Sequence, residues 1–219
     1  MSNPSSILRL VVLGPQGAGK GTQAEILAER LHIPTISPGM ICREAVTKQT
    51  SLGLEIERYV KSGQLVPDIL ITQIMQDRLS QPDALEGWIA DAYPRDHAQL
   101  EGMLSFTQPS HALVLQISDE EAIDRLEGRR ECAQCKHNYH VRHVPPAIEG
   151  VCDRCEGVLL RRDDDYPEAI RKRLEIYHTQ TEPILERFEG MGILCRVDGS
   201  GGIDAVARRV AACLGMEPA

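Results

Sequence analysis

Short apolar runs alternate with longer stretches of helical periodicity along this chain of 219 residues. The runs are apolar almost throughout, which is typical of strands buried on both faces of a sheet. They lie at 7–14, 88–92, 112–117 and 192–197, and a further short strand is expected at 34–37. Between them, apolar residues recur three and four apart, as Ala24, Leu27 and Leu31 do, and so predict amphipathic helices. These helices are expected from residue 19 onwards, over 41–49, 52–62, 119–128 and 203–214, and after a start at Pro67. Strands that alternate with helices predict an α/β fold with a parallel sheet.

Residues 129–161 interrupt this alternation. They contain two pairs of cysteines and the sequence Pro145-Pro146, and they show almost no helical period. We therefore expect an inserted segment here. The helical pattern that follows, over 166–188, contains Pro183, which is expected to kink or break the helix.

The composition indicates a folded domain. Hydrophobic residues make up 42% of the chain and charged residues 26%, so the chain can bury a core and lacks the signature of disorder. The formal net charge of −8 argues against a general nucleic-acid binder. No basic residue precedes the first apolar run, and no run approaches the roughly 20 residues that cross a bilayer. We expect no signal peptide, no membrane span, and a cytoplasmic protein whose thiols stay reduced.

Four of the seven cysteines form the pattern C-x2-C-x16-C-x2-C. They are Cys132, Cys135, Cys152 and Cys155. The spacing is typical of zinc sites, and four thiolates would close a tetrahedral, structural site with no open position for catalysis. A redox pair, two disulfides or four unrelated thiols are the alternatives, and iron is an alternative to zinc. Of the scattered cysteines, Cys195 and Cys213 are expected to be small core residues.

The stretch GPQGAGKGT, residues 14–22, follows a predicted strand and opens a predicted helix. Gly14, Gly19 and Lys20 match the G-x-x-x-x-G-K phosphate loop, in which backbone N–H groups, a helix N-terminus and a lysine surround phosphate oxygens. The alternative is a tight glycine-rich turn without a ligand. The hydroxyl comes one residue later than in the common form, because Gly21 precedes Thr22.

The variant GAGKGTQ resembles the nucleoside monophosphate kinases, and the adenylate kinase family in particular. Further motifs of that family appear in order: SPGMICRE, SGQLVPD, DAYPRDHAQ, DRLEGRR, RRDDD with RKRL, and VDGSG. The resemblance covers essentially the whole chain, and the four cysteines are similar to the zinc-binding lid of some bacterial members.

The resemblance implies a P-loop fold of three layers, α/β/α, around a central parallel sheet. It implies a core of residues 1–36, 67–128 and 162–219, a helical acceptor-binding subdomain of 37–66, and a zinc-stapled lid of 129–161. The implied reaction is ATP + AMP = 2 ADP with Mg²⁺, carried out by a monomer. The implied partners are ATP, AMP and ADP, without nucleic acid or membrane.

The resemblance also implies roles for individual residues. The catalytic group would be Lys20, Asp91, Arg95, Arg125, Arg129, Arg162 and Arg173. ATP would contact Gly17, Ala18, Gly19, Lys20, Gly21, Thr22, Arg125, Arg129, Tyr139 and Gly201. AMP would contact Pro38, Arg43, Gln64, Leu65, Val66, Ala92, Tyr93, Arg95, Gln99, Arg162 and Arg173. Asp164 and Asp165 match lid hinge and salt-bridge positions, and His140 a hydrogen-bonding residue of the lid or a substitute metal ligand.

The sequence departs from the family pattern mainly on the acceptor side. Pro38 stands where the family usually has threonine, Met40 where it has aspartate, and Ala92-Tyr93 where it has Gly-Phe. Gln16 replaces a frequent proline in the phosphate loop, a change expected to matter little. Three alternatives therefore stay open: a kinase with another acceptor, a nucleotide-binding regulator without catalysis, and a zinc-ribbon module that binds nucleic acid.

Overall fold

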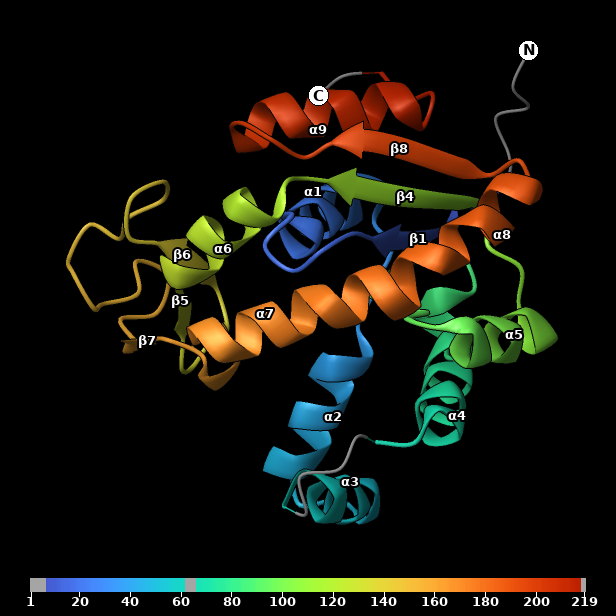
Figure 1. The fold of residues 1–219 in the computed structure, drawn as a ribbon. Helices are drawn as coiled ribbons and strands as arrows, with labels where there is room; N and C mark the ends of the chain where they lie inside the picture. Colours follow the sequence, from blue (N-terminus) through green and yellow to red (C-terminus); the bar gives the residue numbers. More distant parts are fainter. Residues whose placement is uncertain (1–6, 62–65, 218–219) are drawn as a thin grey trace.

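A computed structural model describes residues 7–61 and 66–217, and it has a parallel sheet at its centre (Figure 1). The order of the strands is β2-β3-β1-β4-β8, and every pairing is parallel. The strands are β1 (Arg9–Leu13), β2 (Thr35–Ile36), β3 (Trp88–Asp91), β4 (His111–Gln116) and β8 (Leu194–Asp198). All five were predicted, and the parallel α/β fold is confirmed. The described residues include no helix long and apolar enough to cross a membrane.

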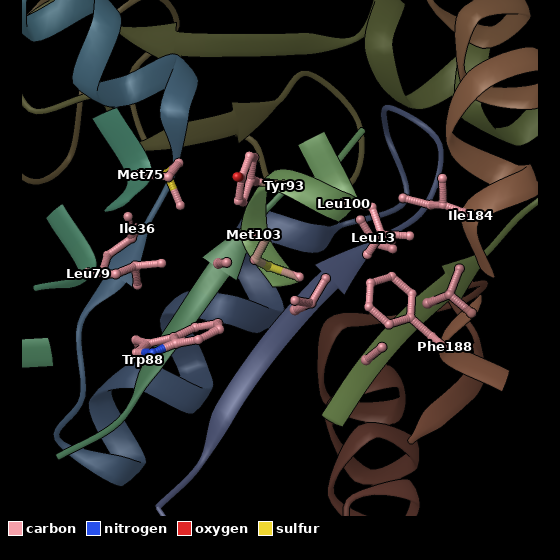
Figure 2. Close-up of a cluster of buried hydrophobic side chains, with 14 of the residues drawn as sticks. Leu13, Ile36, Met75, Leu79, Trp88, Tyr93, Leu100, Met103, Ile184 and Phe188 are labelled. Atoms are coloured by element: carbon pink, nitrogen blue, oxygen red, sulfur yellow. The ribbon is translucent and has the colours of Figure 1, made fainter. Parts of the chain in front are cut away.

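Helices cover both faces of this sheet, so that the core has three layers. Along β1, Leu10 and Val12 pack into one apolar cluster, whereas Val11 and Leu13 pack into another. This alternation follows from the two-residue period of a strand. The first cluster is covered by α1 (Lys20–Leu31) and α9 (Ile203–Cys213). The second is covered by α4 (Asp68–Leu79), α5 (His97–Phe106) and α8 (Leu185–Gly190), and it surrounds Trp88, Tyr93 and Phe188 (Figure 2).

Helix α5 was not predicted from the sequence. Its start is marked by Asp96, whose carboxylate accepts a 2.8 Å hydrogen bond from the backbone N–H of Gln99. Aspartate at this position satisfies one of the free N–H groups of a helix N-terminus. The buried Leu100 and Met103 lie three apart, as helical periodicity requires. The sequence therefore contained a cap and a helical period for α5, but the period extends over few residues.

A pair of helices, α2 (Pro38–Thr47) and α3 (Ser51–Lys61), projects away from the sheet between β2 and α4 (Figure 1). Helix α2 begins earlier than predicted because Pro38, with its fixed φ, is well suited to the first helical position. The two helices pack closely, since a Cβ built on Gly53 would lie 2.0 Å from the carbonyl oxygen of Ala45.

The segment predicted as an insertion forms a small antiparallel sheet of its own, in the order β6-β5-β7. Its strands are β5 (Arg129–Cys132), β6 (Asn138–His140) and β7 (Leu159–Leu160). The sequence predicted the insertion but not these strands. The helix before it, α6 (Asp119–Glu127), begins after Ser118, whose hydroxyl accepts a hydrogen bond from the backbone N–H of Glu121.

The helical segment after the insertion is interrupted, as Pro183 predicted. It consists of α7 (Pro167–Ile176), a π-helical turn (Tyr177–Thr181), a 3₁₀ turn (Glu182–Ile184) and α8. The irregular part brings the hydroxyl of Thr181 to within 2.6 Å of the carbonyl oxygen of Arg95, to which it donates. The π-helical turn after α7 is thereby hydrogen-bonded to the loop after β3.

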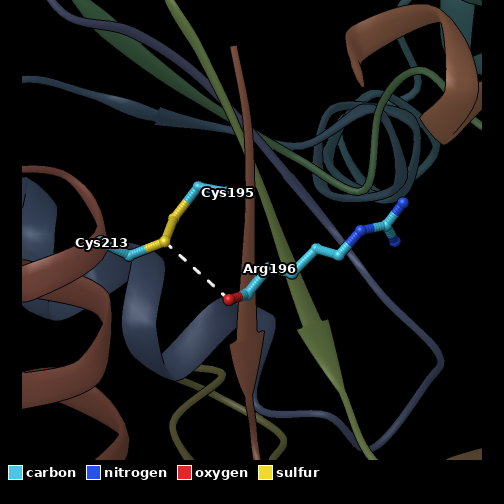
Figure 3. The surroundings of a disulfide bond; sticks show 3 residues. All are labelled: Cys195, Arg196 and Cys213. Atoms are coloured by element: carbon cyan, nitrogen blue, oxygen red, sulfur yellow. Dashed lines mark hydrogen bonds between the residues drawn. A yellow bond between two sulfur atoms is a disulfide. The ribbon is translucent and has the colours of Figure 1, made fainter. Parts of the chain in front are cut away.

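The prediction that Cys195 and Cys213 are small core residues is confirmed for Cys195 and wrong for Cys213. They form a disulfide between β8 and α9, with their Cα atoms 6.0 Å apart (Figure 3). Cys195 is buried, but Cys213 is exposed on the outer side of the last helical turn. The helical period placed Cys213 only approximately, and residues distant in sequence cannot be paired from spacing alone.

Candidate functional site

The phosphate loop lies between β1 and α1, as its motif predicted. Gly14 begins it with φ of +136°, and a Cβ there would lie 2.3 Å from the carbonyl oxygen of Leu115. Only glycine fits such a position. Gly19, with φ of +90°, is the N-cap of α1, so the free N–H groups of that helix end point into the loop. This arrangement is a ready-made binding site for phosphate oxygens.

Lys20 is the central cation of the loop. Its Nζ donates two hydrogen bonds of 2.8 Å to the carbonyl oxygens of Gly14 and Pro15. Burial lowers the pKa of Lys20 to about 7, although the nearby Asp91 carboxylate raises it. Further lowering of this pKa comes from the positive charges of Arg95, Arg173 and Arg129. The site therefore gathers several positive charges, which a bound anion would balance.

Asp91 ends β3 next to β1, paired in register with Val12. A Cβ built on Gly21 would lie 3.8 Å from its Oδ2, so the carboxylate faces the phosphate loop. Its Oδ1 is buried, and no donor among the described residues bonds to it. Burial raises the pKa of Asp91, while Lys20 and Arg95 lower it. A buried carboxylate oxygen with a free lone pair fits a water of a hydrated Mg²⁺ ion.

Three arginines near the base of the lid are paired with two aspartates. Arg129 makes a bidentate contact of 2.8 and 2.5 Å with Asp165, whose side chain is fully buried. Arg162 lies 3.0 Å and Arg173 2.8 Å from the carboxylate of Asp164. The salt bridges predicted at the two aspartates are confirmed. Because arginine binds phosphate in the same bidentate way, these guanidinium groups can exchange a carboxylate for a phosphate.

Arg125 joins two loops at the other side of the site. It donates to the carbonyl oxygens of Gly17 in the phosphate loop (3.3 Å) and of Gly199 after β8 (2.9 Å). It also pairs with Glu121 at 2.5 Å on its own helix. The loop that contains Gly201 is therefore held close to the phosphate loop, as expected if both contact one nucleotide.

The loop after β3 presents the predicted acceptor residues. Ala92 has φ of +56°, a left-handed conformation that is unfavourable for any residue with a Cβ. Its carbonyl oxygen accepts a 2.9 Å hydrogen bond from Nε of Arg95. Both ends of the Gln99 amide are engaged, since Oε1 accepts from the N–H of Arg95 (3.0 Å) and Nε2 donates to Asp68 (2.7 Å). The side chain of Tyr93 is turned into the core.

The other predicted acceptor residues come from α2 and from the start of α4. Pro38 is buried, whereas the side chain of Met40 is 54% exposed. Desolvation lowers the pKa of Arg43, and the charges of Arg162, Glu131 and Asp164 also act on it. Arg43 on α2 therefore faces the cations at the base of the lid. Val66 precedes α4 and is partly buried, and Gln64 and Leu65 lie outside the described residues.

The four cysteines of the lid converge. The Sγ atoms of Cys132, Cys135, Cys152 and Cys155 all lie within 4.8 Å of one another. Two of the separations, from Cys132 to Cys155 and from Cys135 to Cys152, are 3.5 Å. Four sulfurs at about 2.3 Å from a tetrahedral zinc ion are roughly 3.8 Å apart, so this set fits the ion.

The two cysteine pairs have the same backbone shape. The N–H of Lys136 donates to the carbonyl oxygen of Cys132 (3.1 Å), and the N–H of Glu156 donates to that of Cys152 (2.8 Å). Both residues follow the second cysteine of their pair and are left-handed, with φ of +61° and +59°. Neither is glycine, so the turn is unfavourable on its own. Two identical strained turns indicate that both pairs are shaped for one ligand.

Tyr139 and His140 are turned toward the lid interior. The hydroxyl of Tyr139 lies 3.5 Å from Sγ of Cys152 and accepts from the N–H of Asp153 (2.8 Å). Its ring thus packs with the cysteines rather than with the arginines. Nδ1 of His140 accepts from two backbone N–H groups, and Nε2 lies 3.4 Å from the carbonyl oxygen of Asp124. The prediction of a hydrogen-bonding histidine is confirmed.

Sequence reasoning missed several residues that hold the site in shape. Asp68, Glu131 and Thr181 anchor Gln99, Arg162 and the Arg95 loop respectively. None of them belongs to a motif quoted for phosphate binding. Only Asp68, in the stretch SGQLVPD, could have been noticed, because an acid beside a predicted helix start is a common feature of caps.

Comparison with known proteins places this arrangement in one family. The sequence model of the family described as adenylate kinase matches residues 12–193. An adenylate kinase of Streptomyces coelicolor is 44% identical over 208 residues, which cover 92% of this chain and 96% of that protein. Those of Acidothermus cellulolyticus and Clostridium botulinum are 42% and 40% identical, and the matches cover 94% and 96% of this chain and 98% and 100% of those proteins. The chain therefore belongs to the adenylate kinase family.

Proposed function

We propose that the chain transfers a phosphoryl group reversibly from ATP to AMP and forms two molecules of ADP. The observation that carries this proposal is the convergence of Lys20 with Arg95, Arg129 and Arg173 beside a phosphate loop. Phosphoryl transfer needs positioning and cations around the group in transit, and little covalent chemistry from the protein. This cluster supplies both, in a chain whose net charge is −8.

Each residue then has a role that its surroundings support. Lys20 and the N–H groups of the phosphate loop would bind the ATP phosphates, and Arg125 would hold the loop near Gly201 against the adenine side. Arg95 and Arg43 would bind the acceptor phosphate. Arg129, Arg162 and Arg173 would leave their aspartates for the group in transit. Asp91 would hold a metal-bound water, and Mg²⁺ supplied with ATP would neutralise phosphate charge.

We further propose the three-part organisation stated above for the core, the acceptor-binding subdomain and the lid. The antiparallel sheet of the lid begins at Arg129 and ends at Leu160, which supports a lid of 129–161. The salt bridges at Asp164 and Asp165 lie where the chain returns to α7, which supports a hinge there. Closure would exclude water and so protect ATP from hydrolysis. The monomer implied by the family resemblance stays a prediction, which the molar mass in solution tests.

The lid cysteines would hold a structural Zn²⁺ ion. The proximity of the four sulfurs and the paired strained turns support this, and the four thiolates leave no open position on the ion. Metal analysis of the purified protein tests it. One zinc per chain is expected, and one iron per chain would replace this proposal with an iron site.

The acceptor is the least constrained part of the proposal. Pro38 lacks a hydroxyl, and the carbonyl of Ala92 already accepts from Arg95. These two observations favour a second candidate, a kinase for another nucleoside monophosphate, while the cluster of arginines around Lys20 counts against an inactive regulator. A coupled assay of Mg·ATP with AMP, GMP, CMP, UMP and dAMP at equal concentration separates the candidates. Turnover with AMP at least tenfold above the others supports the proposal, and preference for another base refutes AMP as the acceptor.

A further inference from the structure

Gln16, the third residue of the phosphate loop, lines a small cavity beside Lys20 and Arg95. The cavity measures about 20 Å³, which is room for about one water molecule. Its other walls are Leu13, Gly14, Lys20, Ala92, Arg95, Tyr177 and Thr181. Gln16 thus lines one small space together with Lys20, which is assigned to the ATP phosphates, and Arg95, which is assigned to the acceptor phosphate.

The carboxamide oxygen of Gln16, Oε1, is buried without a hydrogen-bond donor among the described residues. Buried polar atoms in folded proteins nearly always have a partner, and the exceptions point to a water or a ligand. An unpaired oxygen in the wall of a functional cavity therefore indicates a partner that enters the cavity.

Three donors in the cavity wall bond to other oxygens. Nζ of Lys20 donates to the carbonyl oxygens of Gly14 and Pro15. Nε of Arg95 donates to the carbonyl oxygen of Ala92, and the hydroxyl of Thr181 donates to that of Arg95. None of these bonds reaches Oε1 of Gln16, and the cavity has room for a water as its partner.

We propose that Gln16 is a further residue of the phosphoryl-transfer site, whose Oε1 holds a water that donates its second hydrogen to the transferred phosphoryl group. A phosphate oxygen accepts hydrogen bonds but does not donate, so it cannot pair directly with Oε1. A bridging water supplies one hydrogen to each oxygen. Proline, which is frequent at this position in similar loops, has no group that could hold this water. The inference rests on the proposed function.

The test compares Gln16→Met and Gln16→Pro with the unchanged chain. Methionine keeps the length of the side chain but removes the acceptor, and proline is compatible with such loops. In both variants the Kd for ATP, measured by calorimetry, should rise about threefold to tenfold, and kcat should fall by at least the same factor. The Kd for AMP should stay within twofold, since AMP carries no phosphoryl group at that position.

Gln23 supplies a matched control. Its Oε1 is also buried without a donor among the described residues, but it lies on α1 and does not line the cavity. Gln23→Met therefore removes the same kind of oxygen at another place. Both Kd values should stay within twofold of those of the unchanged chain, whatever the change in Tm.

The outcomes separate the inference from the function on which it rests. An unchanged Kd for ATP in Gln16→Met overturns the inference, and so does an equal weakening of ATP and AMP, which would indicate a purely structural role. Absence of turnover with AMP in the unchanged chain overturns the proposed function. In that case the Kd for ATP still decides the role of Gln16.

Discussion

In the core, side chains from the parallel sheet and from helices on both faces pack into two apolar clusters, whereas the lid packs only a few residues. Its small cluster consists of Cys132, Tyr139, Cys152 and Leu159, with Cys155 against it. Segments of this size rarely fold on apolar burial alone, and metals commonly supply the missing stability. The lid is therefore expected to depend on its thiolates, and the core on its packing.

This difference has a consequence for function. If the proposed zinc ion and the salt bridges at its base hold the lid, the lid can move as a unit without disturbing the packed core. The buried Asp165 and the partly exposed Asp164 form that base, and both pair with arginines that phosphate would attract. The two aspartates and a bound phosphate would therefore compete for the same arginines, and this competition would couple phosphate binding to the position of the proposed lid.

The largest effect is expected from removal of the metal. A strong chelator, or Cys152→Ser, should unfold the lid, because metal binding supplies its folding free energy. Turnover should fall more than tenfold, and hydrogen exchange should lose its protection over 129–161. The single tryptophan, Trp88, is buried in the core, so its fluorescence should keep the same unfolding midpoint. Cys42→Ser, outside the cluster, is the control. A large shift of the Trp88 transition on chelation would contradict the independence of the two regions.

Loss of the disulfide should have the opposite pattern of effects: it should destabilise the core and leave the lid unchanged. Cys195 and Cys213 are separated by 18 residues, and closing a loop of that length stabilises by about 3 kcal/mol in the chain-entropy account. Reduction, or Cys213→Ser, should lower the free energy of unfolding reported by Trp88 by about that amount and leave lid protection unchanged. A reductant should have no further effect on Cys213→Ser. If reduction leaves the Trp88 transition of the unchanged chain where it was, the bond does not stabilise the core.

The third effect arises where lid and core meet, at Lys20. Its pKa is about 7 in the folded chain, against 10.5 as the ordinary value, because burial disfavours the charged form. Between these two values the unfolded chain binds the proton that the folded chain has released. Stability should therefore rise from pH 7 to about pH 10, by at most about 1.4 kcal/mol per pH unit. Lys20→Met should remove this rise.

The lowered pKa of Lys20 also predicts that the protein takes up protons from solution when ATP binds. At pH 8 most Lys20 side chains are neutral, and the phosphates of ATP would raise their pKa and draw in up to one proton per ATP. Calorimetry in two buffers of different ionisation enthalpy measures this number. Uptake near zero in the unchanged chain would show that Lys20 is already charged, and Lys20→Met gives the baseline.

The sequence predicted the core better than the lid for a physical reason. Buried parallel strands read as continuous apolar runs, and four of the five strands were located in this way, whereas β2 was predicted only as a short strand at 34–37. The phosphate loop was found because its glycines are required at fixed positions, such as Gly14. The strands of the lid are only two to four residues long and show no alternation of apolar and polar residues, so the sequence did not predict them.

Contacts between distant residues were beyond the reach of the sequence. The disulfide from Cys195 to Cys213 and the bond from Thr181 to the Arg95 loop each join separate elements. Gln16 illustrates the limit most clearly. In the sequence, Gln16 was only a replacement of a frequent proline that was expected to matter little. The proposed role of Gln16 follows from the cavity that it lines and from its unpaired oxygen.

The smallest effect concerns backbone strain, which both regions contain. In the core, the left-handed Ala92 is held in place because its N–H donates to the carbonyl oxygen of Val12 (3.0 Å) and its carbonyl accepts from Arg95. In the lid, Lys136 and Glu156 have the same conformation beside the cysteines. A left-handed conformation costs a residue with a Cβ about 1–2 kcal/mol, and glycine avoids that cost.

Ala92→Gly should therefore stabilise the core by about 0.5–1 kcal/mol, after the larger entropy of glycine in the unfolded chain is subtracted. The Tm reported by Trp88 should rise by about 1–4 °C. Lys136→Gly should leave that Tm unchanged and instead slow the loss of metal to a chelator, because its strain is confined to the lid. If Lys136→Gly moved the Trp88 transition as far as Ala92→Gly does, the two regions would share one cooperative unit, and the contrast between a packed core and a metal-held lid would fail.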